Sequence, residues 1–293
     1  MIVTKLMGGM GNQMFQYAFA KYLAIKHNVP VKLDTRFLLD RSPKGANFVF
    51  RNFDLDIFNL SVEVATDAEI TSLTHRTGHE LTNRVINKLI GRKKNHVFEP
   101  HFHFSEKCFL AGSNSYLEGY WQSEKYFKPI EGLLRAKDFS FKSAMSSMAT
   151  ELGNTIQSSN SVCVNIRRGD FVTNDFHGTK GVDFYSNAEL VIGSELNDPH
   201  YFVFSDEMDW CTENITFAGK VTYVGHEYAG FKFQDYIRLM AMCKHFIIPN
   251  SSFAWWAVWL NDNKNKMVVA PKKWFNNPAW ETHDLIPDEW IKV

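Results

Sequence analysis

Two arginines follow a buried strand in the middle of this chain, and this feature constrains its fold most strongly. The β-branched run at 162–166 predicts a buried strand, and Arg167, Arg168, Gly169 and Asp170 follow it directly. Ligands of open α/β sheets bind beyond the carboxyl ends of the strands, so paired arginines there indicate an anion site. A guanidinium can hold two phosphate oxygens at once, and Asp170 can fix one arginine while the other meets the ligand. A strand-end ion pair that only closes a loop is the alternative.

A glycine-rich turn near the N-terminus has a related pattern. Residues 1–6 predict a strand, residues 7–14 a glycine turn, and residues 15–26 a helix. Gly9 and Gly11 let backbone N–H groups approach an anion, and the helix N-terminus adds partial positive charge. A tight strand-to-helix turn without a ligand would need only the glycines.

Two amides in that turn, Asn12 and Gln13, suggest a sugar ligand, because an amide can both donate to and accept from a polyol. The turn is not a P-loop, since it lacks the Lys-Ser/Thr pair that reaches phosphates and magnesium. It also lacks the spacing of a dinucleotide-binding fingerprint.

Strands and helices alternate along both halves of the chain, which predicts an α/β fold with two sheets facing one another. The polar run at 157–161 is expected to link two α/β domains, one at 1–155 and one at 156–293, with the last helix able to pack back on the first domain. The further strands are expected at 29–34, 200–204, 219–224, 245–248 and 267–270, and a helix at 233–243.

A polar turn precedes an apolar helix in the second half. Asn250, Ser251 and Ser252 come just before Phe253 and the rest of the run to 260, so they are expected to cap that helix. Their polar groups and the free backbone N–H groups of the helix can form an anion nest.

The aromatic-rich stretch at 116–127 fits a sugar surface, since aromatic faces stack on pyranose C–H groups and short polar groups take the hydroxyls. Glu118 ends a predicted strand in this stretch, beside Gly119. Packing at a helix start explains the same residues equally well.

Metal sites are not expected in this chain. Asp54 and Asp56 form an Asp-x-Asp, but the apolar/polar alternation at 53–58 predicts a half-buried strand instead. His101 and His103 would point the same way from a strand, yet no third ligand accompanies them at zinc spacing.

Composition restricts partners and compartment. The 32 basic residues balance 32 acidic ones, which argues against nucleic acid. We expect a cytoplasmic protein, because no signal peptide or membrane span is visible. A basic cluster, Lys88, Arg92, Lys93 and Lys94, is a solvated face or a peripheral contact with anionic lipid. The cysteines are expected to be reduced core residues: Cys108, Cys163, Cys211 and Cys243.

Taken together, the motifs resemble those of the α-1,2-fucosyltransferases of glycosyltransferase family eleven, in the family's order and almost end to end. The matching segments are Gly8 to Ala18, Gly119 to Ser123, Ile166 to Asp170, Phe204 to Glu207 and Asn250 to Trp256. The resemblance implies a GT-B-type architecture, with an N-terminal acceptor domain and a C-terminal GDP-fucose domain across a cleft.

The resemblance also implies an activity: inverting, metal-independent transfer of L-fucose from GDP-β-L-fucose to the 2-hydroxyl of a terminal galactose, in a surface glycan such as an O-antigen. No cofactor is implied. Arg167 would contact the β-phosphate, Arg168 would support the loop, and Asp206 would lie near the guanosine. Ser251 and Ser252 would lie near the pyrophosphate, and the glycine loop would close over the donor from the other domain.

The family usually has histidine where this chain has Asn165. If that residue serves through its backbone nothing is lost, whereas a side-chain contact to the nucleotide would alter donor affinity. An inverting displacement benefits from a general base, for which Glu118 is our candidate. A fucosyltransferase of another linkage, and a non-catalytic glycan- or nucleotide-binding protein of the same fold, are the competing hypotheses. The sequence does not predict an oligomeric state.

Overall fold

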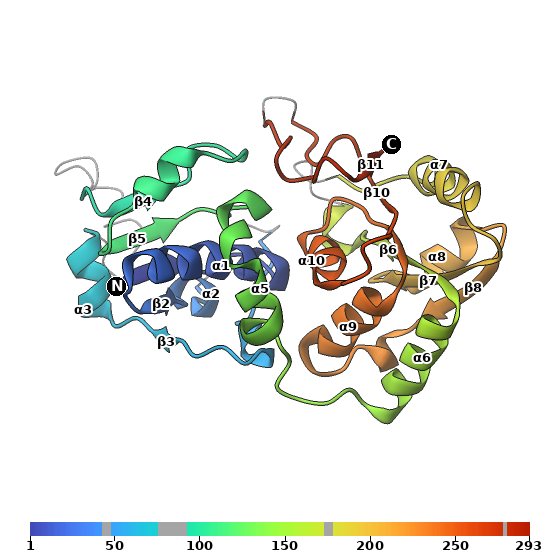
Figure 1. The fold of residues 1–293 in the computed structure, drawn as a ribbon, viewed down its shortest axis with the longest axis horizontal. Coiled ribbons are helices and arrows are strands. Elements are labelled where there is room, and N and C mark those ends of the chain that lie inside the picture. Colours follow the sequence, from blue (N-terminus) through green and yellow to red (C-terminus); the bar gives the residue numbers. More distant parts are fainter. Residues whose placement is uncertain (43–47, 76–92, 173–177, 278–279) are drawn as a thin grey trace. The chain divides into compact units, whose positions relative to one another are not determined.

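The computed structural model describes residues 1–42, 48–75, 93–172, 178–277 and 280–293, and it divides into two compact units, each with one β-sheet (Figure 1). Unit 1 contains Met1–Ser140 and His283–Leu285, and unit 2 contains Phe141–Thr282 and Ile286–Val293. Both sheets are parallel, so the α/β class and the pair of Rossmann-like domains are confirmed. That the domains face one another across a cleft stays a prediction.

Unit 1 has a sheet of order β3-β2-β1-β5-β4. Its strands are β1 (Ile2–Lys5), β2 (Val31–Asp34), β3 (Glu63–Val64), β4 (His96–Phe98) and β5 (Ser115–Glu118). Its helices are α1 (Met10–His27), α2 (Arg36–Leu39), α3 (Asp67–Leu73) and α5 (Glu131–Leu133), with single turns η1 (Leu55–Ile57), η2 (Glu106–Leu110), η3 (Glu124–Tyr126), η4 (Lys128–Ile130) and η5 (Leu134–Asp138).

Helix α1 forms the crossover between the parallel strands β1 and β2. Its side chains Phe15, Tyr17 and Phe19 are buried, and Phe19 packs against Trp121 and Tyr126 with ring centroids 4.7 and 4.8 Å away. This aromatic contact joins α1 to the chain that follows β5.

Unit 2 has a sheet of order β11-β10-β9-β6-β7-β8. Its strands are β6 (Asn160–Ile166), β7 (Pro199–Ser205), β8 (Lys220–Val224), β9 (His245–Ile247), β10 (Val268–Ala270) and β11 (Ile291–Lys292). Its helices are α6 (Ser147–Ser158), α7 (Val182–Gly193), α8 (Met208–Asn214), α9 (Gln234–Met242) and α10 (Ser252–Leu260), with single turns η6 (Gly169–Phe171), η7 (His226–Tyr228) and η8 (Phe231–Phe233).

Alternate residues of β6 point to opposite faces of this sheet. Val162, Val164 and Ile166 share an apolar core with residues of α7 and α8, such as Tyr185 and Cys211. Helix α9 contacts both α6 and α10 (Figure 1). The strand is buried from Ser161 to Ile166, as the sequence predicts for a central parallel strand.

The predicted strand at 53–58 is wrong, because this segment contains the single 3-10 turn η1. The buried side chains of Leu55, Ile57 and Phe58 explain the apolar pattern equally well. Gln13 occupies backbone groups that a strand would need for pairing, since its side chain accepts from Asp54 N at 2.9 Å and donates to Asn52 O at 2.8 Å.

Two boundaries also differ from expectation. Helix α1 begins at Met10, so Gly11, Asn12 and Gln13 belong to its first turn and not to a loop. The units divide after Ser140, and the polar run at 157–161 connects α6 to β6 within unit 2. Of the described C-terminal residues, His283–Leu285 belong to unit 1, and the packing of a last helix on that unit stays a prediction.

Candidate functional site

Four neighbouring strands of unit 2 end at one edge of the sheet and bring the sequence-predicted residues together. Arg167 follows β6, Asp206 follows β7, His226 follows β8 and Ser251 follows β9. Strand β6 pairs with both β7 and β9, so the chain winds away from β6 in both directions. Such a switch point is where doubly wound sheets bind ligands.

The loop that carries Arg167 and Arg168 is held by the carboxylates after β7. Arg167 Nη1 lies 2.7 Å from Asp206 Oδ2, and the other oxygen of Asp206 accepts from Arg168 N at 2.9 Å. A methyl group at Gly169 would lie 2.5 Å from Asp206 Oδ2, so only glycine allows this approach. Asp206 therefore fixes the arginine loop with both of its oxygens. The side chain of Asp170, expected in this role, lies outside the described residues.

Arg168 is held by two further contacts. Its Nε donates to Glu207 Oε2 at 2.9 Å, and its guanidinium lies 3.7 Å from the ring centroid of Trp210. These contacts agree with a supporting role for Arg168, and neither Glu207 nor Trp210 was among the site residues expected from sequence.

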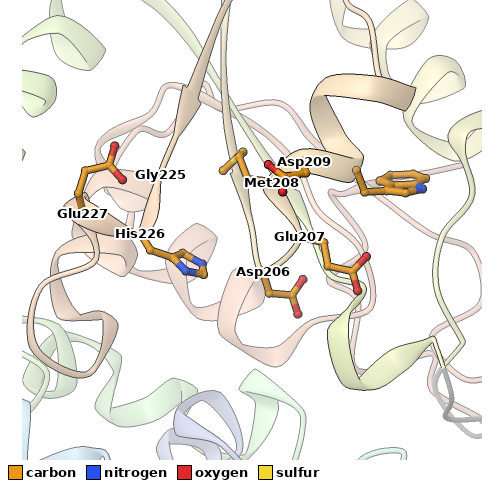
Figure 2. A pocket seen from close by; sticks show the side chains of 8 residues that line it. Asp206, Glu207, Met208, Asp209, Gly225, His226 and Glu227 are labelled. Carbon is orange, nitrogen blue, oxygen red and sulfur yellow. The ribbon is translucent and has the colours of Figure 1, made fainter.

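A pocket of about 610 Å³ opens beside this ion-pair network, at the carboxyl ends of β7 and β8 (Figure 2). It is lined by Asp206, Glu207, Met208, Asp209, Trp210, Gly225, His226 and Glu227. Carboxylates are numerous in this lining, and they accept hydrogen bonds from N–H and O–H groups. The lining suits a ligand that presents donors, such as the N–H edge of a guanine or ribose hydroxyls. The order of the strands predicts that residues after β8 lie at the ligand edge. The residues at 225–227, however, form no recognisable binding motif in the sequence.

Asn165 is a buried residue next to the carboxyl end of β6. Its Nδ2 donates to Phe204 O at 3.2 Å, and its backbone oxygen accepts from the Tyr185 hydroxyl at 3.3 Å. Burial raises the pKa of Tyr185 well above its usual value, so the phenol stays a donor. Within the described part of the chain, Asn165 Oδ1 has no hydrogen-bond partner.

The turn after β9 caps α10 as expected. Ser251 Oγ accepts from Ala254 N at 3.4 Å, and Asn250 Nδ2 donates to Trp274 O at 2.9 Å. Asn250 and Ser251 are buried, whereas Ser252 and Phe253 are half-buried at the helix start. Helix α10 therefore begins at the same sheet edge as Arg167, and its N-terminus adds partial positive charge there.

The glycine turn of unit 1 connects β1 to α1. Gly8 has φ +75°, a left-handed conformation that favours glycine, and Gly9 is the residue preceding α1. Asn12 Oδ1 accepts from Gln122 Nε2 at 2.7 Å. Gln13 is fully buried, and its amide bonds Gly8 O and the 52–54 segment. In this structure its side chain holds the turn, and the sugar contact expected of it stays a prediction.

Glu118 ends β5, as predicted. Its Oε1 lies 3.0 Å from Lys5 Nζ, and its Oε2 lies 2.8 Å from His96 Nε2. A cation and an imidazole therefore orient the carboxylate. The side chain is 13% exposed, so it still reaches the surface of unit 1.

Glu99, which the sequence did not single out, clamps the chain after β5. Its Oε2 accepts from Tyr120 N at 2.6 Å, and its Oε1 accepts from Trp121 N at 2.8 Å. Burial raises the pKa of Glu99 to about 7, although these two backbone N–H groups oppose the rise.

His101 and His103 do not lie in a strand, yet their rings stack with centroids 3.4 Å apart. Across the described ranges, no group of three metal-ligating side chains has a geometry that could hold an ion. The cysteines are buried and unpaired, as expected.

The basic cluster near residue 92 is only partly described, because Lys88 and Arg92 lie outside the described residues. Lys93 Nζ donates to the carbonyls of Thr71 and Ser72, at 2.8 and 2.9 Å, near the end of α3. Among the described helices, none is both long and apolar enough to cross a membrane.

A chain with two parallel sheets, one of which has Arg167 and a helix N-terminus at its switch point, defines a protein of the doubly wound α/β class. The family model "Glycosyl transferase family 11" matches residues 80–293. This chain belongs to glycosyltransferase family 11.

Curated relatives extend the match over the whole chain. An O-antigen biosynthesis glycosyltransferase of Escherichia coli, WbnK, is 33% identical over 98% of this chain and 99% of its own length. An alpha-1,2-colitosyltransferase of Escherichia coli is 29% identical over 100% of this chain and 98% of its own. The galactoside 2-alpha-L-fucosyltransferase Sec1 of Mus musculus is 33% identical over 36% of this chain and 30% of its own.

Among solved structures, NodZ alpha-1,6-fucosyltransferase soaked with GDP-fucose is similar with a TM-score of 0.47 and 14% identity, over 88% of this chain and 92% of that one.

Proposed function

We propose that this protein transfers L-fucose from GDP-β-L-fucose to the 2-hydroxyl of a terminal galactose, with inversion and without a metal. The observation that carries the proposal is the Arg167–Asp206 ion pair at the switch point of a family 11 sheet, next to a pocket rich in carboxylates. The full-length relative WbnK, which is described as acting in O-antigen biosynthesis, supports a surface glycan as the acceptor.

The order of features along the sheet edge suggests how the donor binds. The α10 N-terminus follows β9, and Arg167 follows the neighbouring strand β6, so both cationic elements suit a pyrophosphate. The pocket after β7 and β8 then suits the guanosine. Because Asp206 and Glu207 both hold the arginine loop, Asp209 and Glu227 are better placed to accept from the guanine N–H groups.

Chemistry and geometry agree in this scheme. In an oxocarbenium-like transition state, negative charge grows on the departing GDP, and a fixed cation with a helix N-terminus stabilises it. Arg167 is preorganised for this task because Asp206 holds its guanidinium before any ligand arrives. We keep Glu118 as the proposed general base, since Lys5 and His96 orient its carboxylate at the end of β5.

A colitosyl donor is the second candidate, because the relative that matches 100% of this chain is described as an alpha-1,2-colitosyltransferase. Colitose is fucose without its 3-hydroxyl, so both sugars can share the nucleotide site. Another linkage and a non-catalytic binding protein are the remaining alternatives.

The test is GDP release from GDP-fucose by purified protein, with and without lactose, followed by linkage analysis of the product. Lactose-dependent release with fucose on the galactose 2-hydroxyl supports the donor, the reaction and the linkage together. Faster turnover of GDP-colitose would favour the second donor. Binding of both donors without turnover, across other galactosides too, would favour the binding-protein alternative.

A further inference from the structure

Glu99 joins two segments that follow neighbouring strands of unit 1. It directly follows β4, and its backbone N donates to Glu118 O at 3.1 Å, which extends the β4–β5 pairing by one residue. Its carboxylate then turns back over Gly119 and accepts from the next two backbone N–H groups, at 2.6 and 2.8 Å. A carboxylate that receives two N–H groups is a strong, directional clamp.

The turn under this clamp is unusual. A methyl group at Gly119 would lie 2.4 Å from Glu99 Cβ, so glycine is required for the approach. Trp121 has φ +57°, a left-handed conformation that costs a residue with a side chain about 1 kcal/mol or more. Its indole is fully buried against Phe19 and Tyr126. Strain of this kind persists only where surrounding contacts enforce it.

The next residue after Trp121 in this turn is Gln122, which is 6% exposed. Its Nε2 donates at 2.7 Å to Asn12 Oδ1, in the first turn of α1. A methyl group at Gly8 would lie 2.4 Å from Asn12 Nδ2, so Asn12 also packs against the glycine turn. A continuous set of contacts therefore runs from Glu99 through Gln122 and Asn12 to Gly8.

We propose that Glu99 is a positioning residue for the transferase reaction, whose ionised carboxylate fixes the 119–122 turn so that Gln122 holds Asn12 and the glycine turn in place. The proposal rests on the proposed function only where it assigns the glycine turn to the reaction. Glu99 itself touches no reacting group in this scheme; it acts through Gln122.

The surroundings make the ionisation of Glu99 sensitive near neutral pH. The titratable groups that face it are Tyr120, Tyr126 and Cys108, and burial raises the pKa of each, so all three are neutral. In the described part of the chain, no cation forms an ion pair with Glu99. Burial therefore raises the pKa of Glu99 to about 7, and the two backbone N–H groups, which stabilise the ionised carboxylate, oppose that rise.

The test compares Glu99→Gln with Glu106→Gln, which changes an exposed carboxylate in η2. A glutamine can accept only one of the two N–H groups and turns an NH₂ toward the other. We expect kcat with GDP-fucose to fall about tenfold or more in Glu99→Gln, with a thermal midpoint within a few degrees of wild type. Glu106→Gln should match wild type in both.

A second measurement needs no substrate. The amide shifts of Tyr120 and Trp121 in wild-type protein should titrate together between about pH 5.5 and 8.5, and kcat should rise over the same interval. Both changes should disappear in Glu99→Gln. If that variant does not fold, the wild-type shifts and pH profile decide the question.

The proposal is overturned by near-normal kcat in Glu99→Gln, or by amide shifts that do not move with pH. Titrating amides in a protein that turns over no donor would instead mean that the clamp exists and the proposed function is wrong. Loss of kcat in proportion to loss of folded protein would reduce Glu99 to a stability role and would also overturn the proposal.

Discussion

Arg167 and Asp206 form an ion pair of 2.7 Å between the chain segments after β6 and β7. The two side chains are 28% and 22% exposed, so solvent screens the pair and its contribution to stability is modest, about 1 kcal/mol or less. Its main consequence is geometric, because the guanidinium is held at the sheet edge before a ligand binds.

Replacement of Arg167 by alanine should reduce kcat with GDP-fucose by about 10²-fold or more, because a preorganised cation at the leaving group is lost. The fold should persist, since the side chain is a surface one. Steady-state kinetics with a circular-dichroism melt checks both points. Arg135→Ala, which breaks a surface pair with Glu131, is the matched control and should leave the rate unchanged. A near-normal rate in Arg167→Ala would refute the phosphate assignment.

Asp206→Asn should lower kcat/KM by about tenfold, because an amide can still accept from Arg168 N but no longer attracts the Arg167 guanidinium. Glu213→Gln, an exposed change on α8, is the control. Kinetics of the double variant with Arg167→Ala provides the decisive comparison. If Asp206 acts through Arg167, the second change should add little; fully additive losses would contradict that coupling.

Gly8→Ala and Gly9→Ala should differ in stability although the residues are neighbours. At Gly8 a methyl group meets Asn12 and the backbone is left-handed, whereas at Gly9 nothing lies within 4 Å and φ is −76°. Urea unfolding should show a loss of about 1–2 kcal/mol for Gly8→Ala and a smaller loss for Gly9→Ala, which only weakens a helix cap. Equal losses would argue against the left-handed turn.

Stability should fall as the pH rises through the titration of Glu99. The pKa of this carboxyl is about 7 in the folded protein and about 4.5 when exposed, so the fold favours the protonated form. Its contribution is complete below pH about 4.5 and disappears as pH passes about 7, with a span on the order of 3 kcal/mol at most.

Urea titrations of wild type and Glu99→Gln at a series of pH values measure this effect as a difference, which cancels other titrating groups. The wild type should lose stability relative to the variant between about pH 4.5 and 7. A difference that does not depend on pH, or that grows in the opposite direction, would show that the carboxyl titrates normally.

A chelator should leave fucosyl transfer unchanged, because cationic side chains and a helix N-terminus are proposed to stabilise the leaving GDP. The comparison is the rate before and after exhaustive treatment with EDTA. Loss of activity that manganese restores would overturn the metal-independent scheme and return attention to Asp54 and Asp56 as ligands.

Much of this architecture follows from local sequence. The β-branched run before Arg167 became β6, the polar turn at 250–252 caps α10, and Glu118 ends β5, because apolar runs, glycines and capping residues act over a few neighbouring positions. The family was also accessible from sequence, since its motifs lie in order along the chain.

The local sequence pattern gave a wrong prediction where a side chain distant in sequence determines the backbone conformation. The 53–58 segment alternates like a strand, but Gln13 binds the backbone N–H of Asp54 from 41 residues away, and residues 55–57 form a 3-10 turn. Gln13 also donates to Gly8 O, so its amide holds the glycine turn and the 52–54 segment together, a role that the sequence does not predict.

The sequence by itself determined the α/β class, the strand-end motifs and the family of this protein. Only the tertiary structure decided which carboxylate meets which arginine: Asp206 and Glu207, which follow the neighbouring strand β7, hold Arg167 and Arg168. It also revealed Glu99, whose partners are 21 and 22 residues away. The physical reason is that parallel pairing brings the carboxyl ends of strands together whatever their separation in the chain, and a contact made there leaves no periodic mark in either segment.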